Sequence, residues 1–185
     1  AKAARASDAA ELANSVRVGG LFAIACQARQ DADLRRRLTT GLRVASAARS
    51  GGLGRSTRDF ARLFARHITP PPAVGQSEWE SILYELLLKL QTNLFQMGDM
   101  AIGVFPTACL FEHSCRPNAV VRVGDESLVI TSARAISAGE CVTFSYGIDC
   151  DCEPQTRNRR ARILSEMGLW CQCEECLESD ETRSR

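Results

Sequence analysis

The chain has 185 residues, of which 45% are hydrophobic and 24% charged, and its net charge is +1. These values are ordinary for a soluble globular protein, and the length is enough for one domain with its own core. No apolar run is long enough to span a bilayer and no signal-peptide pattern is present, so we expect no membrane partner. The first residue is Ala1 rather than Met, which suggests a fragment or a processed product.

Charge is unevenly distributed along the chain. Residues 1–66 carry 13 Lys and Arg against 5 Asp and Glu, whereas residues 67–185 carry 10 against 17. We interpret the basic first third as a solvated, Arg-rich helical face. Contact with nucleic acid or with an acidic partner is the alternative.

The nine cysteines are many for this length, and their odd number leaves one unpaired in any disulfide scheme. Their spacing is unlike that of a small secreted disulfide scaffold. Thiolate ligation of a metal in a reducing compartment, the nucleus or the cytoplasm, is the better interpretation.

The first 76 residues are expected to form helices and a linker. Residues 1–49 predict two short helices broken near Gly19 and Gly20, and residues 50–56 predict a flexible loop. Helical spacing returns over residues 60–67, with His67 at the helix end. The prolines that follow predict a stiff linker over residues 69–72.

The clearest predicted helix begins at a capping box formed by Ser77 and Glu80. Asn93 falls on its apolar face, where a buried amide needs hydrogen-bond partners. From the pattern alone, Asn93 is interpreted as a capping or backbone-bonding residue near the helix end. The apolar positions follow helical spacing; they are Trp79, Ile82, Leu83, Leu86, Leu87, Leu90 and Leu94.

The segment over residues 110–118 is the feature around which the second half of the chain is arranged. It holds two chemically capable side chains, His113 and Cys115, and Pro117 excludes a helix there. Taken alone, it is equally well a turn around a buried cysteine.

Short strands and one helix are predicted after this segment. Residues 119–123 and 128–131 predict a hairpin, and residues 141–146 predict a further strand. A last helix is expected between Pro154 and Gly168. We interpret its four arginines as a solvated face, with peptide or nucleic-acid contact as the alternative; they are Arg157, Arg159, Arg160 and Arg162.

Three motifs of the second half stand in a characteristic order. They are Glu112-His113-Ser114-Cys115-Arg116-Pro117-Asn118, then Gly139-Glu140-Cys141-Val142-Thr143-Phe144-Ser145-Tyr146, then Cys171-Gln172-Cys173-Glu174-Glu175-Cys176. With the Gly103-Val104-Phe105-Pro106 lead-in, they resemble the C-terminal half of a SET domain, the lysine methyltransferase fold, in its SMYD (SET and MYND) branch. The resemblance covers roughly residues 80–178.

The resemblance implies an α+β fold in three parts. A helical and linker segment over residues 1–76 would precede the C-terminal part of a SET-domain β core over residues 77–149. A post-SET helix and a zinc-binding cysteine loop would follow over residues 150–185.

The same resemblance implies an S-adenosylmethionine-dependent methyltransferase that acts on a lysine of a histone or another protein. Tyr146 matches the catalytic tyrosine, and Phe144 matches the position that limits how many methyl groups the site accepts. The implied contacts with S-adenosylmethionine are Asn93, Glu112, His113, Tyr146 and Leu169. Glu112 stands where the family has asparagine, and Leu169 stands where it has an aromatic residue.

A structural zinc site needs four ligands, usually thiolates. Cys171, Cys173 and Cys176 supply three of them from one tight loop, and the spacing leaves Cys150 and Cys152 as candidates for the fourth. The resemblance instead implies Cys115 as the fourth ligand. We expect the remaining three cysteines to be core thiols; they are Cys26, Cys109 and Cys141.

Two alternatives to an enzyme remain from the sequence. One is a non-catalytic SET remnant that acts as a zinc-containing protein-interaction module, favoured by Glu112 and Leu169. The other is an unrelated zinc-binding module whose Arg-rich first third contacts nucleic acid.

Overall fold

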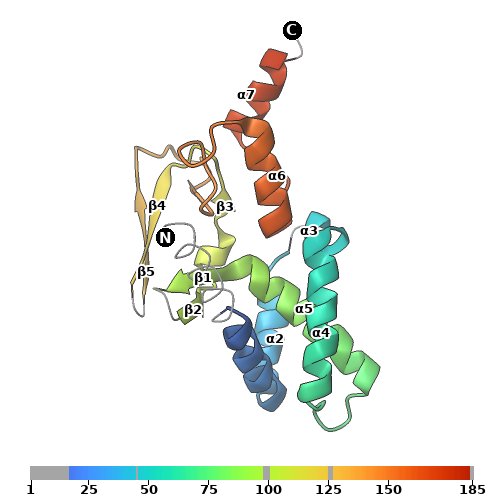
Figure 1. Cartoon of the computed structure of the whole chain (residues 1–185). Coiled ribbons are helices and arrows are strands. Elements are labelled where there is room, and N and C mark those ends of the chain that lie inside the picture. The colour runs from blue at the N-terminus through green and yellow to red at the C-terminus, as the bar shows by residue number, and fades with distance from the viewer. Residues whose placement is uncertain (1–16, 45, 98–100, 125–126, 184–185) are drawn as a thin grey trace, which may run out of the picture. The chain divides into compact units, whose positions relative to one another are not determined.

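The computed structural model describes residues 17–44, 46–97, 101–124 and 127–183 (Figure 1). The chain forms two compact units. The first comprises the residues up to Arg43 together with Ser56–Phe105, and the second comprises Val44–Arg55 together with the chain from Pro106 onward. The mixture of helices and strands confirms the α+β prediction. No helix in the described part of the chain has the length and apolar character needed to cross a membrane.

The first unit is built mainly from helices. They are a helix over residues 17–30, α2 (Ala32–Gly41), most of α4 (Gly52–His67) and α5 (Gln76–Asn93). The periodic face of α5 is buried as predicted, with Trp79, Leu83, Leu86, Leu87 and Leu90 fully enclosed.

The predicted capping box at the start of α5 is wrong. The helix begins at Gln76 with Gly75 as its N-cap, and no side chain caps it. Ser77 therefore lies inside the first turn, and Glu80 pairs with Arg62 of α4 at 3.2 Å instead. The indole nitrogen of Trp79, which donates to the carbonyl of Ile68 at 2.7 Å, ties α5 to the end of α4.

Two glycine-based predictions are also wrong, for a common reason. The helix over residues 17–30 runs through Gly19 and Gly20 without a break. A Cβ on Gly20 would lie 2.5 Å from the side chain of Ile102, so this glycine permits close packing rather than a turn. The predicted loop over residues 50–56 is mostly the first turn of α4, where a Cβ on Gly54 would lie 2.1 Å from the carbonyl oxygen of Arg49.

An antiparallel pair of strands, β1 (Leu94–Met97) and β2 (Ala101–Val104), follows α5. Leu94, expected as the last apolar position of the helix, is the first residue of β1 and pairs with Val104. The rings of Phe95 and Phe105 pack edge to face beside this pair, with centroids 5.7 Å apart.

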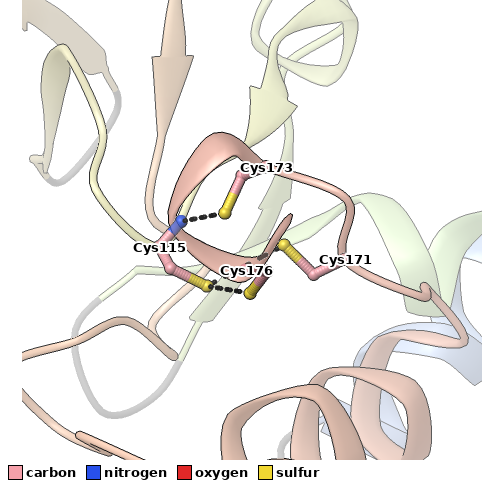
Figure 2. A group of neighbouring side chains, drawn as sticks. All are labelled: Cys115, Cys171, Cys173 and Cys176. Atoms are coloured by element: carbon pink, nitrogen blue, oxygen red, sulfur yellow. Dashed lines mark hydrogen bonds between the residues drawn. The ribbon is translucent and has the colours of Figure 1, made fainter. Parts of the chain in front are cut away.

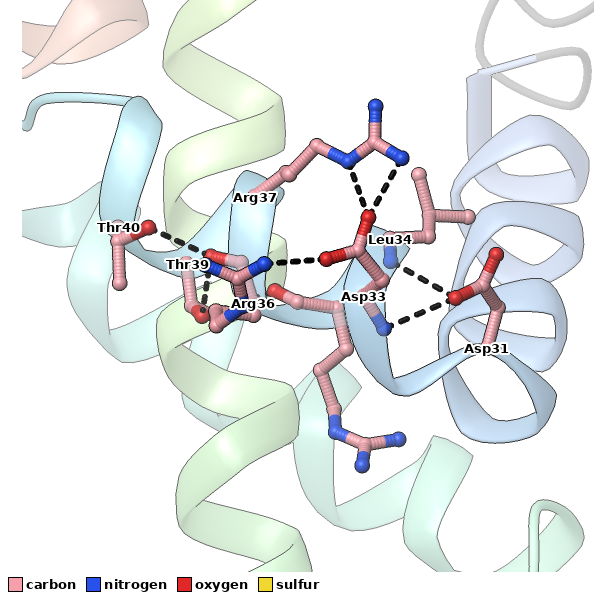
Figure 3. Close-up of polar contacts among 8 residues, drawn as sticks. Asp31, Asp33, Leu34, Arg36, Arg37, Thr39 and Thr40 are labelled. Carbon is pink, nitrogen blue, oxygen red and sulfur yellow. Dashed lines mark hydrogen bonds and ion pairs between the residues drawn. The ribbon is translucent and has the colours of Figure 1, made fainter.

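Acidic side chains on α2 partner part of the basic first third (Figure 3). Asp31 caps the helix by accepting hydrogen bonds from the backbone N–H groups of Asp33 and Leu34, both at 2.9 Å. Asp33 in turn pairs with Arg36 and Arg37, one helical turn further on. These pairs are exposed, as expected for a solvated helical face.

The second unit has short strands and three helices. The elements are α3 (Ser46–Ser50), the 3-10 helix η1 (Ala108–Leu110), β3 (Glu112–His113), β4 (Ala119–Val123), β5 (Leu128–Ser132), β6 (Thr143–Phe144), α6 (Thr156–Met167) and α7 (Glu174–Arg183). The predicted hairpin is confirmed as the antiparallel pair β4–β5. The strand predicted over residues 141–146 is reduced to the two residues of β6, which pair in parallel with β3.

The last predicted helix is confirmed as α6. It ends at Gly168, which has a φ of 64°, a left-handed conformation that favours glycine. A Cβ at this position would lie 2.3 Å from that of Ala48 in α3, so the same glycine also permits close packing of α3. α7 was not predicted, because its acidic sequence has no apolar stripe.

Candidate functional site

Residues 110–118, here called the central segment, are held in a bent shape by hydrogen bonds to the chain around β6. Ser114 donates its backbone N–H to the carbonyl of Phe144 at 3.2 Å. The buried amide of Asn118 spans the same gap, donating to the carbonyl of Cys141 at 2.8 Å and accepting from the backbone N–H of Thr143 at 2.8 Å. Asn118 also donates to the Glu140 carboxylate at 2.9 Å. The side chain of Asn118 therefore joins the central segment to residues 140–143, which lie more than 20 positions further along the chain.

His113 connects this segment to two other site residues. Its Nδ1 accepts the backbone N–H of Tyr146 at 3.1 Å, and its Nε2 lies 3.4 Å from the sulfur of Cys115. Since Nδ1 accepts, the proton of the neutral ring lies on Nε2 and can be donated to that sulfur. Burial lowers the pKa of His113 to about 4, so the ring is neutral at physiological pH.

Tyr146 is half-buried, with its hydroxyl at the end of a defined hydrogen bond. The hydroxyl donates to the carbonyl of Phe111 at 2.7 Å. Burial, assisted by the nearby charge of Glu112, raises the pKa of Tyr146 to about 12. The phenol is therefore neutral at physiological pH, and since its proton is already donated, its oxygen remains available only as an acceptor.

Phe144 belongs to a small aromatic cluster with Tyr146 and Phe111. Its side chain is buried, and its ring centroid is 5.3 Å from that of Tyr146 and 6.2 Å from that of Phe111. The rings of Phe144 and Tyr146 therefore lie together, although only Phe144 belongs to β6 and Tyr146 follows the strand.

Four cysteine sulfurs lie close together where residues 171–176, here called the cysteine loop, contact the central segment (Figure 2). The ligand atoms of Cys115, Cys171, Cys173 and Cys176 all lie within 4.8 Å of one another. The sulfur of Cys115 is 3.8 Å from that of Cys171 and 3.6 Å from that of Cys176. Metal–sulfur bonds of about 2.3 Å in a tetrahedron place the sulfurs about 3.8 Å apart, so these residues could hold a metal ion.

The rival fourth ligands lie outside this group. The sulfur of Cys152 is exposed and contacts the carbonyls of Gly147 and Asp149. Cys150 packs beside the cluster, and its backbone N–H donates to the carbonyl of Cys115 at 3.3 Å. Of the expected core thiols, Cys141 is instead exposed, while Cys26 and Cys109 are half-buried.

The surroundings of the cysteine cluster favour ionisation of the Cys173 thiol and oppose ionisation of the Cys115 and Cys171 thiols. Burial raises the pKa of Cys115, and it raises that of Cys171 to about 12. Burial also opposes ionisation of Cys173, but the backbone N–H groups of Cys115 and Cys176 outweigh it and lower the pKa to about 7. Cys173 is therefore the thiol best prepared to ionise first.

The prediction that the α6 arginines form a solvated face is wrong for two of the four. Arg157 and Arg162 are exposed, but Arg159 and Arg160 are buried. The reason is that this face of α6 packs on the cysteine loop: Arg160 donates to the carbonyl of Cys171 at 3.0 Å, and its guanidinium lies 5.1 Å from the ring centre of Trp170. An arginine pair at adjacent positions carries no sequence signal for such burial.

An open groove of about 600 Å³ lies in the second unit. Its walls come from the central segment, from the region that leads to β6 and from the cysteine loop. Four of the five predicted cofactor contacts line it, namely Glu112, His113, Tyr146 and Leu169. Residues not singled out in advance also line it, among them Trp170, Arg116, Asn118, Arg134 and Glu174.

Two of the residues predicted to contact the substrate or the cofactor do not line the groove. Phe144 is one of them: its side chain is buried. Asn93 belongs to the first unit, at the end of α5, where its amide donates to the carbonyls of Arg43 and Lys89 at 2.9 and 2.7 Å. The amide of Asn93 thus bonds to backbone carbonyls, as the interpretation from the helix pattern predicted.

A comparison with known families matches residues 28–147 to the SET domain. The match covers more than half of the chain. It includes much of the helical part before residue 77 as well as the central segment and β6.

Individual relatives are similar over roughly half of the chain. One is the "Histone-lysine N-methyltransferase SMYD3" of Mus musculus, 28% identical over 104 residues, which are 54% of this chain and 24% of that protein. Another is the "Putative SET domain-containing protein L678" of Acanthamoeba polyphaga mimivirus, 34% identical over 52% of this chain and 38% of that protein. A third is the "Protein-lysine N-methyltransferase SMYD4" of Mus musculus, 30% identical over 59% of this chain and 16% of that protein. The chain thus matches well under half of the length of these relatives.

Proposed function

The chain belongs to the SET-domain family and resembles the SMYD lysine methyltransferases, and we propose that it forms part of an S-adenosylmethionine-dependent protein-lysine methyltransferase. One observation carries the proposal. Three segments distant in the chain line a single groove: the central segment, the region before Tyr146 and the loop that begins at Leu169. Its volume of about 600 Å³ lies within the usual range of about 300–1,000 Å³ for small-molecule sites.

The groove walls fit a donor that has a flat apolar part and positive charge. Leu169 and Trp170 contribute apolar surface to the lining of the groove, and Glu112 contributes a carboxylate. A carboxylate attracts a cation where an amide would supply hydrogen bonds, so Glu112 would favour the charged end of S-adenosylmethionine. When bound, S-adenosylmethionine supplies an electrophilic methyl group. Asn93 remains a proposed donor contact through the family resemblance alone.

Tyr146 is proposed to orient the reacting groups. Because its proton is donated to Phe111, its oxygen can accept a hydrogen bond from the substrate amine or a weak C–H contact from the methyl group. In this role Tyr146 would hold the amine in line with the methyl group of a bound donor. Phe144, whose ring centroid is 5.3 Å from that of Tyr146, is proposed to limit the space that is available to a methylated amine.

Tyr146 does not act as the base that removes the lysine proton. With a pKa of about 12 it stays protonated at physiological pH. Lysine has an unperturbed pKa of about 10.4, so presenting it unprotonated at pH 7 costs about 5 kcal/mol. An apolar channel and the nearby positive charge of the donor would lower that pKa and provide this free energy.

We propose that the metal bound by the four cysteines is zinc, in a structural role. Cys115 belongs to the central segment and the other three belong to the loop that forms one groove wall, so the metal would fix that wall in place. Thiolate ligands of this kind suit a reducing compartment, and we propose the nucleus or the cytoplasm.

The test uses the complete reading frame that contains this chain, because the chain matches only part of the length of its relatives. We expect calorimetry to show binding of S-adenosylmethionine and mass spectrometry to show methylated lysine on histones or on proteins of a cell extract. If the complete protein binds no donor and transfers no methyl group, the alternative of a non-catalytic SET remnant replaces the proposal.

A further inference from the structure

Arg159 is a buried cation without a carboxylate partner among the described residues. Its side chain is 0% exposed. Its Nη1 donates to the carbonyls of Glu153 and Pro154 at 3.0 and 2.7 Å, and its Nη2 donates to the hydroxyl of Thr156 at 3.2 Å. Its Nε is buried and has no hydrogen-bond partner. These neutral partners satisfy donors but leave the charge uncompensated.

A fully buried, unpaired charge costs several kcal/mol, so a compensating negative group is expected nearby. The groups that fit are the sulfurs of the cysteine cluster. Nη2 lies 4.0 Å from the sulfur of Cys176.

The cluster needs positive charge for the same reason. Four thiolates around one divalent metal carry two surplus negative charges. Here they lie in an apolar environment, since Ile148 and Ile163 are buried in the same cluster. Water is poorly placed to stabilise that charge, so a fixed internal cation would stabilise it more effectively.

We propose that Arg159 is the internal counter-ion of the four-cysteine metal centre and increases its affinity for the metal. This inference rests on the proposed zinc site, and it assigns to Arg159 a role in zinc binding although Arg159 is not a ligand of the metal. Arginine suits the role because its planar fork can be anchored on one side by the carbonyls of Glu153 and Pro154 while the other side faces sulfur.

The test compares zinc affinity in the zinc-loaded chain and three variants, by competition with a chromogenic chelator. Arg159→Met removes the charge at similar length. Arg159→Lys keeps the charge but loses the fork. Arg157→Met is the matched control, because Arg157 is an exposed arginine of the same helix.

We expect Arg159→Met to raise the zinc dissociation constant by about 10- to 100-fold, the usual effect of removing a residue that supports metal ligands. Arg159→Lys should recover most of this loss, and Arg157→Met should match the unaltered chain. If Arg159→Met leaves the affinity unchanged, or if Lys and Met weaken zinc binding equally, Arg159 is not the counter-ion. Absence of zinc from the unaltered chain would overturn the metal proposal itself, which is a separate outcome.

A second measurement separates charge from a purely structural role. Losing the bonds to Glu153 and Pro154 would destabilise the protein with or without metal. Losing an internal counter-ion should therefore lower the thermal midpoint of the zinc-loaded protein by more than that of the metal-free protein, in which no metal holds the four sulfurs as thiolates. Equal lowering in both forms would contradict the proposal. If Arg159→Met does not fold, Arg159→Gln replaces it in both experiments, with the same outcomes.

Discussion

Different interactions stabilise the interior of each of the two units. In the first unit, α5 buries a continuous apolar face that includes Trp79 and Leu87. In the second unit, one hydrophobic cluster contains Cys115, Cys171 and Cys176 alongside only two isoleucines, and β3 and β6 are two residues long. The first unit thus relies on buried area, whereas the second relies on single side-chain bonds and on sulfur. The part with the candidate site should therefore be the part that depends on a metal.

Metal removal should produce the largest effect, and it should destabilise the second unit while leaving the first unit folded. Structural zinc sites contribute about 10–16 kcal/mol of apparent binding free energy, as much as the whole stability of a typical domain. We expect a chelator to abolish hydrogen-exchange protection around Cys115 and Cys171 while α5 stays protected. Cys152→Ser, which alters an exposed thiol outside the group, should retain the metal. Equal loss of protection in both units would remove the contrast.

The reverse experiment targets the first unit. Leu87→Ala deletes a fully buried side chain of α5 and should lower the free energy of unfolding by about 2–5 kcal/mol. Denaturant unfolding measures this change, and elemental analysis should find the zinc content unchanged. An exposed leucine provides the control: Leu63→Ala in α4 should have little effect. Loss of zinc in Leu87→Ala would show that the units are coupled.

Asn118 tests whether the second unit depends on single polar side chains. Asn118→Ala removes three hydrogen bonds and leaves the backbone N–H of Thr143 without this partner, so we expect the free energy of unfolding to fall by about 1–3 kcal/mol. Asn158→Ala is the matched control, because Asn158 is exposed and makes one surface bond to Gln155. If the two variants unfold at the same denaturant concentration, Asn118 does not brace the segment.

Glu140 should give the smallest effect, and one that depends on pH. Hydrogen bonds from Arg134, Asn118 and the backbone of Ser137 lower the pKa of this carboxyl from 4.5 to about 2. Its contribution is therefore fully present above about pH 4.5 and is lost as the pH falls towards 2. The stability gap between the unaltered protein and Glu140→Gln should be constant near neutrality and should close between pH 4.5 and 2. A gap that is independent of pH would contradict this assignment.

The sequence predicted best where local pattern decides the structure. The spacing of apolar residues located α5, and the alternation around a short turn located β4–β5. It failed where a distant contact decides: the glycine at position 20 provides room for Ile102 inside a helix, and it was interpreted as a helix break. β1 was missed because the apolar Leu94 and Phe95 follow α5 directly and look like its continuation.

The same distinction applies to the candidate site. Motif residues such as His113, Cys115 and Tyr146 were found in advance because their types and order are distinctive. Arg159 and Asn118 were missed, since their roles arise from burial and from bonds to segments far away in the chain. An arginine at a helix position gives no sign of whether it faces water or sulfur.

Methyl transfer by Tyr146→Phe tests the central claim most directly. The change removes one hydroxyl and its 2.7 Å bond to Phe111, so stability should fall by about 1 kcal/mol. Activity of the complete reading frame should fall about a hundredfold or more, the scale of losing one positioned polar group. The matched control is Tyr84→Phe, which alters the other tyrosine, in α5 beneath Arg58. The account predicts a large loss of rate for Tyr146→Phe and none for Tyr84→Phe, whereas a rate within twofold of the unaltered enzyme for Tyr146→Phe would contradict it.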